Sequence, residues 1–265
     1  YKGYDYMKSN NIFTNKLGVP ILAISVCMLW GTAFPGLKIS YTELNLSDTD
    51  YFGKMLFASY RFLLAAVFLF IIIYFKDKSS LKNLNRKKYK KLLQLGLIQT
   101  TLQYFFFYNG LAKTTGVKSS ILNTTGIFLT VIVAHFLYKD DRLNSKKLLG
   151  LILGIIGVII VNLSQGSFNF SFNILGEGFI LLSAISATIA SIMVKNLSLH
   201  IKPLILTAHQ MLFGAIALFL IAIIKADPFG LNFTLKTIVL LTYLAFVSAA
   251  GFSIWYSLIK YNNLG

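Results

Sequence analysis

Polar side chains stand inside several long apolar stretches of this sequence, and they are its first candidates for chemistry. They are one cation, three amides and one imidazole: Arg61, Gln99, Gln103, Gln210 and His209. Such groups can bind a polar solute or carry a proton. The sequence contains no paired carboxylates, no glycine-rich phosphate loop followed by Lys-Ser/Thr, and no spaced His cluster, and its single cysteine excludes a disulfide framework. We therefore expect neither an enzyme nor a metal site nor a cofactor.

The elements that position these groups are membrane-spanning helices. The chain has 265 residues, of which 56% are hydrophobic and 13% charged, whereas a soluble domain has about 25% charged residues. About 20 apolar residues cross a bilayer as a helix. The segments that qualify are 17–37, 55–75, 92–112, 118–138, 147–163, 175–194, 203–224 and 237–260. The sequence predicts an all-α, polytopic membrane bundle.

The basic residues indicate how this bundle is oriented. The net charge is +16, and most of the 25 Lys and Arg residues fall in alternate loops, with the densest group in 76–91. Cytoplasmic loops carry such an excess, so we expect a cytoplasmic N-terminus. The same placement, between two spans, favours contact with anionic lipid and argues against nucleic acid as a partner.

Polar and aromatic side chains on the predicted helices are candidates for lining a solute cavity. Trp30 and Phe34 are spaced i, i+4 and would form one aromatic wall, and the amides Gln99 and Gln103 have the same spacing. Amides in hydrocarbon must find partners, so these faces should point into the bundle. Hydrogen bonding between helices, or a place at the membrane interface for the aromatics, is the structural alternative. The full candidate set is Trp30, Phe34, Gln99, Gln103, Tyr104, Tyr108, Asn123, Ser186, Trp255 and Tyr256.

Three further residues are candidates for a structural or gating role. An arginine inside a span is costly unless it pairs or reaches the interface. We expect Arg61 to act as a structural or gating charge, with direct solute binding as the alternative. His209 could couple proton movement, or it could be a hydrogen-bonded interfacial residue. Gln210 is the neutral counterpart of Arg61 in the repeat described next.

An internal repeat relates the two parts of the chain. The stretch Ser59–Ala66 aligns with Ala208–Ala215, and the end of the first predicted span aligns with the end of the sixth. These matches predict two copies of a five-helix unit, 17–163 and 174–265. An odd number of helices inverts the second copy relative to the first, as in many secondary transporters. Eight helices lie within the sequence, and the repeat predicts two more beyond Gly265.

Several motifs resemble the EamA-type branch of the drug/metabolite transporter (DMT) superfamily. They are Trp30-Gly31-Thr32-Ala33-Phe34 in the first span, Arg61-Phe62 in the second, the loop Lys139-Asp140-Asp141-Arg142-Leu143, and the glycines Gly150, Gly154 and Gly157 that follow it. The resemblance implies ten helices around a central cavity that opens alternately to each side. It also implies transport, mostly efflux, of small metabolites such as amino acids. The three glycines share one helix face and are expected to support close packing.

The resulting hypothesis is a secondary transporter of the bacterial inner membrane, whose partners are a small solute, the lipid bilayer and, as an open alternative, a coupling proton. The bacterial origin follows from the resemblance and from a composition rich in Lys, Asn and Ile. The competing hypothesis is a scramblase-like or structural membrane protein that moves or holds lipid.

Overall fold

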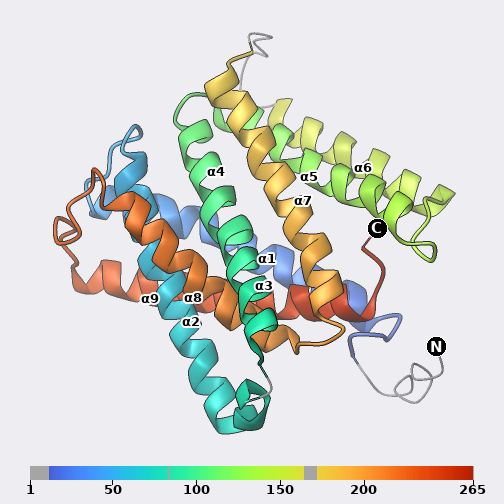
Figure 1. Cartoon of the computed structure of the whole chain (residues 1–265). Coiled ribbons are helices and arrows are strands. Elements are labelled where there is room, and N and C mark those ends of the chain that lie inside the picture. The colour runs from blue at the N-terminus through green and yellow to red at the C-terminus, as the bar shows by residue number, and fades with distance from the viewer. Residues whose placement is uncertain (1–11, 83, 164–171, 265) are drawn as a thin grey trace.

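A computed structural model describes residues 12–82, 84–163 and 172–264 of the chain. Its described residues form helices and connecting loops (Figure 1). In chain order the elements are α1 (Gly18–Glu43), α2 (Tyr51–Lys82), α3 (Arg86–Gly96), the π-helix η2 (Leu97–Leu102), α4 (Gln103–Leu111), α5 (Gly116–Leu137), α6 (Ser145–Leu163), the π-helix η3 (Ile174–Gly178), α7 (Phe179–Leu197), α8 (Pro203–Ala222) and α9 (Leu235–Tyr261).

The predicted fold class is confirmed. Each of the eight predicted spans falls on helical structure, and six described helices are long and apolar enough to cross a membrane. The third predicted span is divided, because the π-helix η2 joins α3 to α4 within it. Local signals set several of the helix starts. Pro203 occupies the first turn of α8, where its missing N–H costs nothing, and the Asn85 side chain caps α3 by accepting from the Lys88 N–H.

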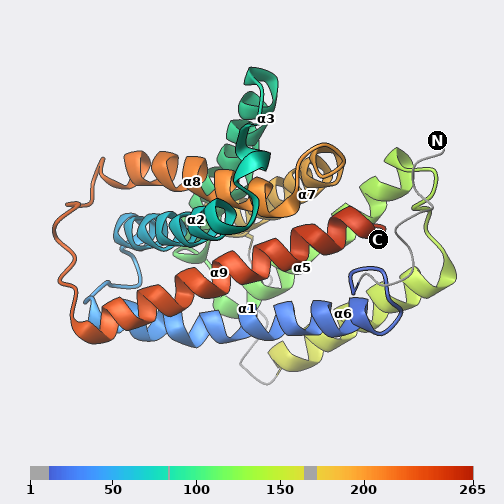
Figure 2. The same ribbon diagram turned by 90° about the horizontal axis from the view of Figure 1, so that it is seen from below.

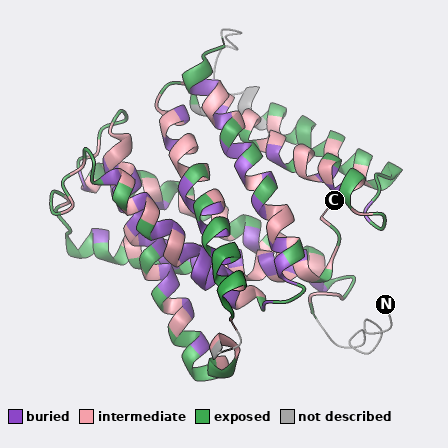
Figure 3. Ribbon diagram, viewed as in Figure 1, coloured by how far each residue is buried: buried purple, intermediate pink, exposed green. Residues whose placement is uncertain are grey.

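The buried centre of the bundle lies where α2 packs against α8 (Figures 2 and 3). α9 packs on α2 and α8, and α1 lies along α9. α4 packs against α7, and α7 packs in turn against α5. Many large apolar side chains are exposed on the outer faces, including Phe75, Phe136 and Leu235. Lipid contact is the expected environment for such faces.

The loops gather at two ends of the bundle. At one end, Asn262 and Asn263 donate to the backbone oxygens of Phe13 and Asp140, each at 2.9 Å. At the other end, Lys236 pairs with Glu43 at 2.6 Å. The first end contains the basic loops that the charge distribution assigns to the cytoplasm. We call it the basic-loop end, and the other the Glu43 end.

The glycines of α6 do not make the close contacts predicted for them. A Cβ placed on Gly150, Gly154 or Gly157 would meet no atom of the described residues within 4 Å, and Gly31 of α1 is equally open. Glycine permits close approach, but a contact forms only where another helix lies across it.

A tight helix crossing is found elsewhere: α8 crosses the end of α3 and the π-helix η2 at close range. A Cβ on Gly214 would lie 2.6 Å from the Gly96 oxygen and would also collide with Thr100, and a Cβ on Gly96 would lie 2.8 Å from the Gln210 oxygen. Gly36 is a milder case, because a Cβ there would come within 3.2 Å of Leu244 on α9. The packing predicted for the α6 glycines is therefore not made within the described part of the chain, whereas Gly36 of α1 does pack closely.

Candidate functional site

Arg61 of α2 is buried in the bundle without an acidic partner. The residue is 4% exposed. Its guanidinium carbon lies 4.3 Å from the centre of the Phe62 ring and 5.5 Å from that of Tyr104. Among the described residues, no ion pair within 4.0 Å involves Arg61, and its Nε has no hydrogen-bond partner. Aromatic faces thus offset part of the cost of burying this charge.

Three tyrosines from α1 and α4 surround this cation. The Tyr41 and Tyr108 hydroxyls are 3.3 Å apart, and the rings of Tyr104 and Tyr108 are 5.9 Å apart. The Tyr104 ring faces the Arg61 side chain, with its centre 5.5 Å from the guanidinium carbon. Tyr108 is 4% exposed, whereas Tyr41 and Tyr104 are half-buried. We call Arg61, Tyr41, Tyr104 and Tyr108 the arginine cluster; it presents one positive charge and three hydroxyls.

A second polar cluster forms around Gln210 of α8, which is fully buried. Its amide nitrogen donates to the Thr100 hydroxyl on η2, and its amide oxygen accepts from the Tyr256 hydroxyl on α9 at 3.2 Å. Tyr256 is 2% exposed. These bonds tie three elements together and satisfy both ends of the amide. We call Gln210, Thr100 and Tyr256 the glutamine cluster.

An aromatic layer between α1 and α9 adjoins the glutamine cluster, where the Phe252 and Tyr256 ring centres are 5.9 Å apart. Trp30 lies 5.4 Å from Phe252 and 5.6 Å from Trp255, measured between ring centres. Gly251 makes this possible, because a Cβ there would lie 2.6 Å from the Trp30 ring nitrogen. Phe34 is not part of the layer, since it lies on the outer face of α1 and is 66% exposed.

The two amides predicted to share a face do so on and beside the π-helix η2. Gln99 is 6% exposed and donates to the side-chain oxygen of Gln103 at the start of α4. The next two residues face α8, where Thr100 meets Gln210 and the Thr101 hydroxyl donates to the Gly214 oxygen at 3.1 Å. π-Helical turns often occur at functional sites, and this one turns Gln99, Thr100 and Thr101 all into the bundle.

His209 is held in a ring of aromatic side chains. It is 4% exposed, and its Nδ1 lies 2.9 Å from the Ile205 oxygen one turn earlier in α8. Its ring centre is 5.0 Å from that of Phe70 and 5.6 Å from that of Tyr89. This geometry favours the hydrogen-bonded alternative for His209.

Two predicted cavity residues lie away from these clusters. Asn123 is exposed on α5. Ser186 is buried on α7, but its hydroxyl donates within its own helix to the Leu182 oxygen at 2.8 Å. Neither residue contacts the arginine or the glutamine cluster in a recorded hydrogen bond or ring pair of the described chain.

The structure adds two site residues that the sequence did not single out. Tyr41 was missed because the apolar run ends near Lys38, whereas α1 continues to Glu43. Its spacing of eleven residues from Trp30, about three helical turns, placed it near the same helix face and was the available signal. Phe252 was missed because nothing in α9 distinguishes it from other apolar residues until α1 is placed beside it.

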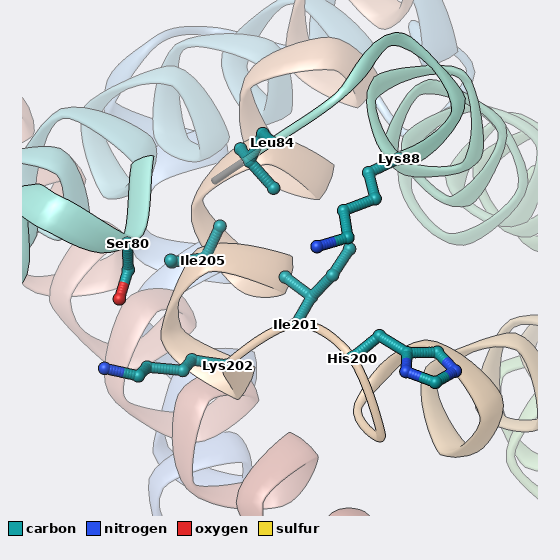
Figure 4. Close-up of a pocket in the computed structure, with 7 residues that line it drawn as sticks. All are labelled: Ser80, Leu84, Lys88, His200, Ile201, Lys202 and Ile205. Atoms are coloured by element: carbon teal, nitrogen blue, oxygen red, sulfur yellow. The ribbon is translucent and has the colours of Figure 1, made fainter. Parts of the chain in front are cut away.

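A separate pocket of about 150 Å³ opens at the basic-loop end (Figure 4). Lys88 reaches in from α3 above Ile201, and Ser80 and Lys202 lie on the opposite side, with Leu84, Ile205 and His200 completing the lining. Lys202 also pairs with Asp77 at 2.5 Å. After Arg61 the regular part of α2 continues for 15 positions to Lys76, roughly 22 Å at 1.5 Å per residue, before the kink at Asp77 that leads to Ser80, so this pocket is distinct from the arginine cluster.

Residues that could bind a metal ion do not gather in the described part of the chain, where no group of three His, Cys, Asp or Glu side chains comes together. Glu177, an acid at the start of one predicted span, is 5% exposed and has structural partners. It accepts from the Thr114 hydroxyl at 2.6 Å and pairs with Lys118 at 3.1 Å.

Comparisons with known proteins agree with one another in returning transporters. A sequence profile of the EamA-like transporter family matches residues 18–163 and 174–265. The uncharacterized transporter YetK of Bacillus subtilis is 30% identical over 74% of this chain and 60% of its own length. An uncharacterized transporter of Archaeoglobus fulgidus is 28% identical over 75% of this chain and 65% of its own length.

More distant proteins share the sequence pattern and the fold. A chloroplastic WAT1-related protein of Arabidopsis thaliana is 26% identical over 77% of this chain and 47% of its own length. The chain thus spans about half to two thirds of these three relatives. A crystal structure of another protein, 14% identical, matches with a TM-score of 0.73 over 92% of this chain and 80% of its own.

Proposed function

This chain belongs to the EamA-like transporter family, and from that premise we propose that it is a secondary transporter that exports small metabolites, of the amino-acid class or related to it, by alternating access. The observation that carries the proposal is the pair of polar clusters inside the bundle. Polar and ionisable side chains within membrane spans are costly, and where they occur they often mark a solute pathway. The arginine cluster joins α1, α2 and α4, and the glutamine cluster joins η2, α8 and α9.

We further propose that two inverted copies, 17–163 and 174–265, supply the two halves that move. The family profile matches two ranges close to these. Packing supports the same relation, because the second predicted span of each copy (α2 and α8) meets the other at the centre. The first span of one copy then packs on the third span of the other, as α1 with α9 and α7 with α4. Gly265, the final residue of the range 174–265, lies outside the described residues.

The proposed setting is a bacterial inner membrane with a cytoplasmic N-terminus. In this orientation the Glu43 end faces outward. A cysteine placed at Lys236, after Cys27→Ser, should react with a membrane-impermeant maleimide on intact cells. A cysteine at Lys202 should react only after lysis. The reverse pattern would contradict the orientation.

We propose that facilitated exchange operates in preference to proton coupling. His209 is the candidate proton carrier, and its Nδ1 is already bonded to the Ile205 oxygen. Flux of a given solute should therefore be the same with and without an imposed pH gradient. Accumulation driven by such a gradient, and lost in His209→Gln, would establish the proton as a coupling ion.

The decisive experiment separates a transporter from a lipid scramblase. Vesicles that contain the purified protein should take up labelled solutes from a panel of amino acids and related metabolites without moving fluorescent lipid between leaflets. Lipid exchange without solute flux would favour the scramblase-like alternative, and protein-free vesicles provide the baseline for both signals.

A further inference from the structure

We propose that Arg61 is the anchor for an anionic group of the solute, and that this group is a carboxylate. The inference rests on the proposed transport function and names the chemistry that its site recognises. Arg61 is the one arginine within the predicted spans, and it is 4% exposed. A buried cation is strongly disfavoured unless an anion accompanies it.

The described part of the chain supplies no such anion near this position. The nearest partners of the guanidinium among the described residues are the rings of Phe62 and Tyr104. No acidic side chain of the described residues lies within 4.0 Å of it. Other buried charges in the structure are handled differently. Glu177 pairs with Lys118, and the half-buried Lys195 donates to the backbone oxygens of Ile259 and Asn262.

The geometry of the guanidinium favours a carboxylate over a single hydroxyl. Arginine presents its N–H groups as a planar fork that matches the two oxygens of a carboxylate. The Nε of Arg61, one arm of the side-on fork, is buried without a hydrogen-bond partner among the described residues. A bidentate carboxylate would satisfy this atom and neutralise the charge in one step.

The surrounding tyrosines complete the site. The hydroxyls of Tyr41 and Tyr108 are 3.3 Å apart, so this pair could donate to an oxyanion beside the guanidinium. Tyr41 and Tyr104 are half-buried, and they form the accessible edge of the arginine cluster. A carboxylate could therefore approach from this edge, while the rest of a small solute lies against aromatic rings.

The two copies of the repeat sharpen the inference. Gln210 aligns with Arg61. It accepts a hydrogen bond from Tyr256 on the third span of its copy, and the Arg61 guanidinium likewise contacts the Tyr104 ring on the third span of the other copy. Gln210 is neutral and its amide is satisfied by protein groups at both ends. Replacing Arg61 with glutamine therefore copies a group that this bundle already accommodates, and the variant Arg61→Gln tests charge recognition with little disturbance of packing.

The test is a binding titration that does not depend on transport. The sequence contains two tryptophans, Trp30 and Trp255, and both lie in the aromatic layer, so intrinsic fluorescence reports on this region. The purified protein in phospholipid-free maltoside detergent is titrated with sodium benzoate and with benzamide, which differ in charge and little in shape. The wild type should bind benzoate about tenfold or more tightly, as expected for hydrogen bonds to a charged group.

The variants decide whether Arg61 is responsible. Arg61→Gln should bind both probes equally, and Arg61→Lys should keep a reduced preference, because an ammonium cannot present the planar fork. Lys195→Gln removes a half-buried cation elsewhere and should behave as wild type. Equal binding of the two probes by the wild type, or an undiminished preference in both Arg61 variants, would overturn the proposal. If Arg61→Gln does not fold, the comparison of Arg61→Lys with the wild type still decides whether Arg61 causes the benzoate preference.

A lipid phosphate could also supply an anion to this arginine, and a second arm separates the two sources. In nanodiscs of phosphatidylcholine, the benzoate preference should equal that in detergent. Added phosphatidylglycerol should leave it unchanged. Loss of the preference in phosphatidylglycerol would assign Arg61 to a lipid headgroup and overturn the solute assignment. If vesicles show solute flux but the protein has no preference for the carboxylate probe, the transport proposal stands and the Arg61 proposal falls. If the protein prefers the carboxylate probe but vesicles show no solute flux, the Arg61 assignment stands and the transport proposal falls.

Discussion

Arg61 and Gln210, at the centres of the two clusters, align in the proposed repeat, yet the electrostatics of the two clusters differ. Gln210 is fully buried, and both ends of its amide are hydrogen-bonded to protein groups. Arg61 is almost as deeply buried, but it carries a charge that no described acid balances and an Nε without a partner. The glutamine cluster thus has the properties of a structural joint, and the arginine cluster those of a binding group.

The largest expected effect concerns the helix crossing beneath the glutamine cluster. Gly214→Ala would place a Cβ 2.6 Å from the Gly96 oxygen and against Thr100. Overpacking of this kind should destabilise the protein by about 3 kcal/mol, measured as a lower midpoint of thermal unfolding in detergent. Gly150→Ala on α6 is the matched control, because no atom lies within 4 Å of its Cβ position. Equal midpoints for the two variants would contradict the crossing.

Replacing the central polar residue of each cluster with an apolar one should affect stability in different ways. Gln210→Leu leaves the Thr100 and Tyr256 hydroxyls without their partner and should cost about 2 kcal/mol in unfolding free energy. Arg61→Met keeps a long side chain against Phe62 but removes an uncompensated charge, and should leave stability unchanged or increase it. If Arg61→Met is the more destabilised of the two in denaturant titrations, then Arg61 is a structural residue and the comparison fails.

The aromatic layer beside the glutamine cluster should matter for transport more than for folding. Trp30→Ala removes the ring that contacts Phe252 and Trp255. It should lower solute flux in vesicles several-fold at unchanged protein abundance. Phe34→Ala is the control one helical turn away, and it should have no effect on flux because Phe34 lies on the outer face. Unchanged flux in Trp30→Ala would remove this layer from the proposed pathway.

The smallest effect should come from trimming one hydroxyl of the glutamine cluster. Tyr256→Phe removes the 3.2 Å bond to the Gln210 oxygen but keeps the ring beside Phe252. Hydrogen bonds between membrane helices average about 0.6 kcal/mol, so the unfolding free energy should fall by about that amount. A loss as large as that of Gln210→Leu would mean that Tyr256, and not Thr100, holds the cluster together.

The sequence was sufficient for the helices and for part of the site. Each predicted span is a run of apolar residues of membrane length, and such a run has few alternatives to a helix. Arg61, Gln99 and Gln210 were identifiable because polar groups in lipid must face the bundle, and all three are buried. The polarity of these residues was therefore enough to predict that their side chains point into the bundle.

The remaining features depend on which helices meet, and a single helix cannot specify that. Trp30 and Phe34 share a face by spacing, but α9 covers Trp30 and leaves Phe34 exposed. The glycines of α6 form a clear stripe that meets no described helix, while Gly96 and Gly214, which lie in no such stripe, make the close crossing. Tyr41 joined the arginine cluster because α1 extends beyond its apolar run.

The central claim is that a transporter recognises an anionic solute through Arg61, and one flux measurement tests it most directly. Vesicles containing wild-type protein or Arg61→Gln are given labelled amino acids and their carboxamide derivatives in parallel. We predict that the wild type transports at least one amino acid faster than its carboxamide, and that Arg61→Gln transports both at similar rates. Equal discrimination by the two proteins would contradict the claim.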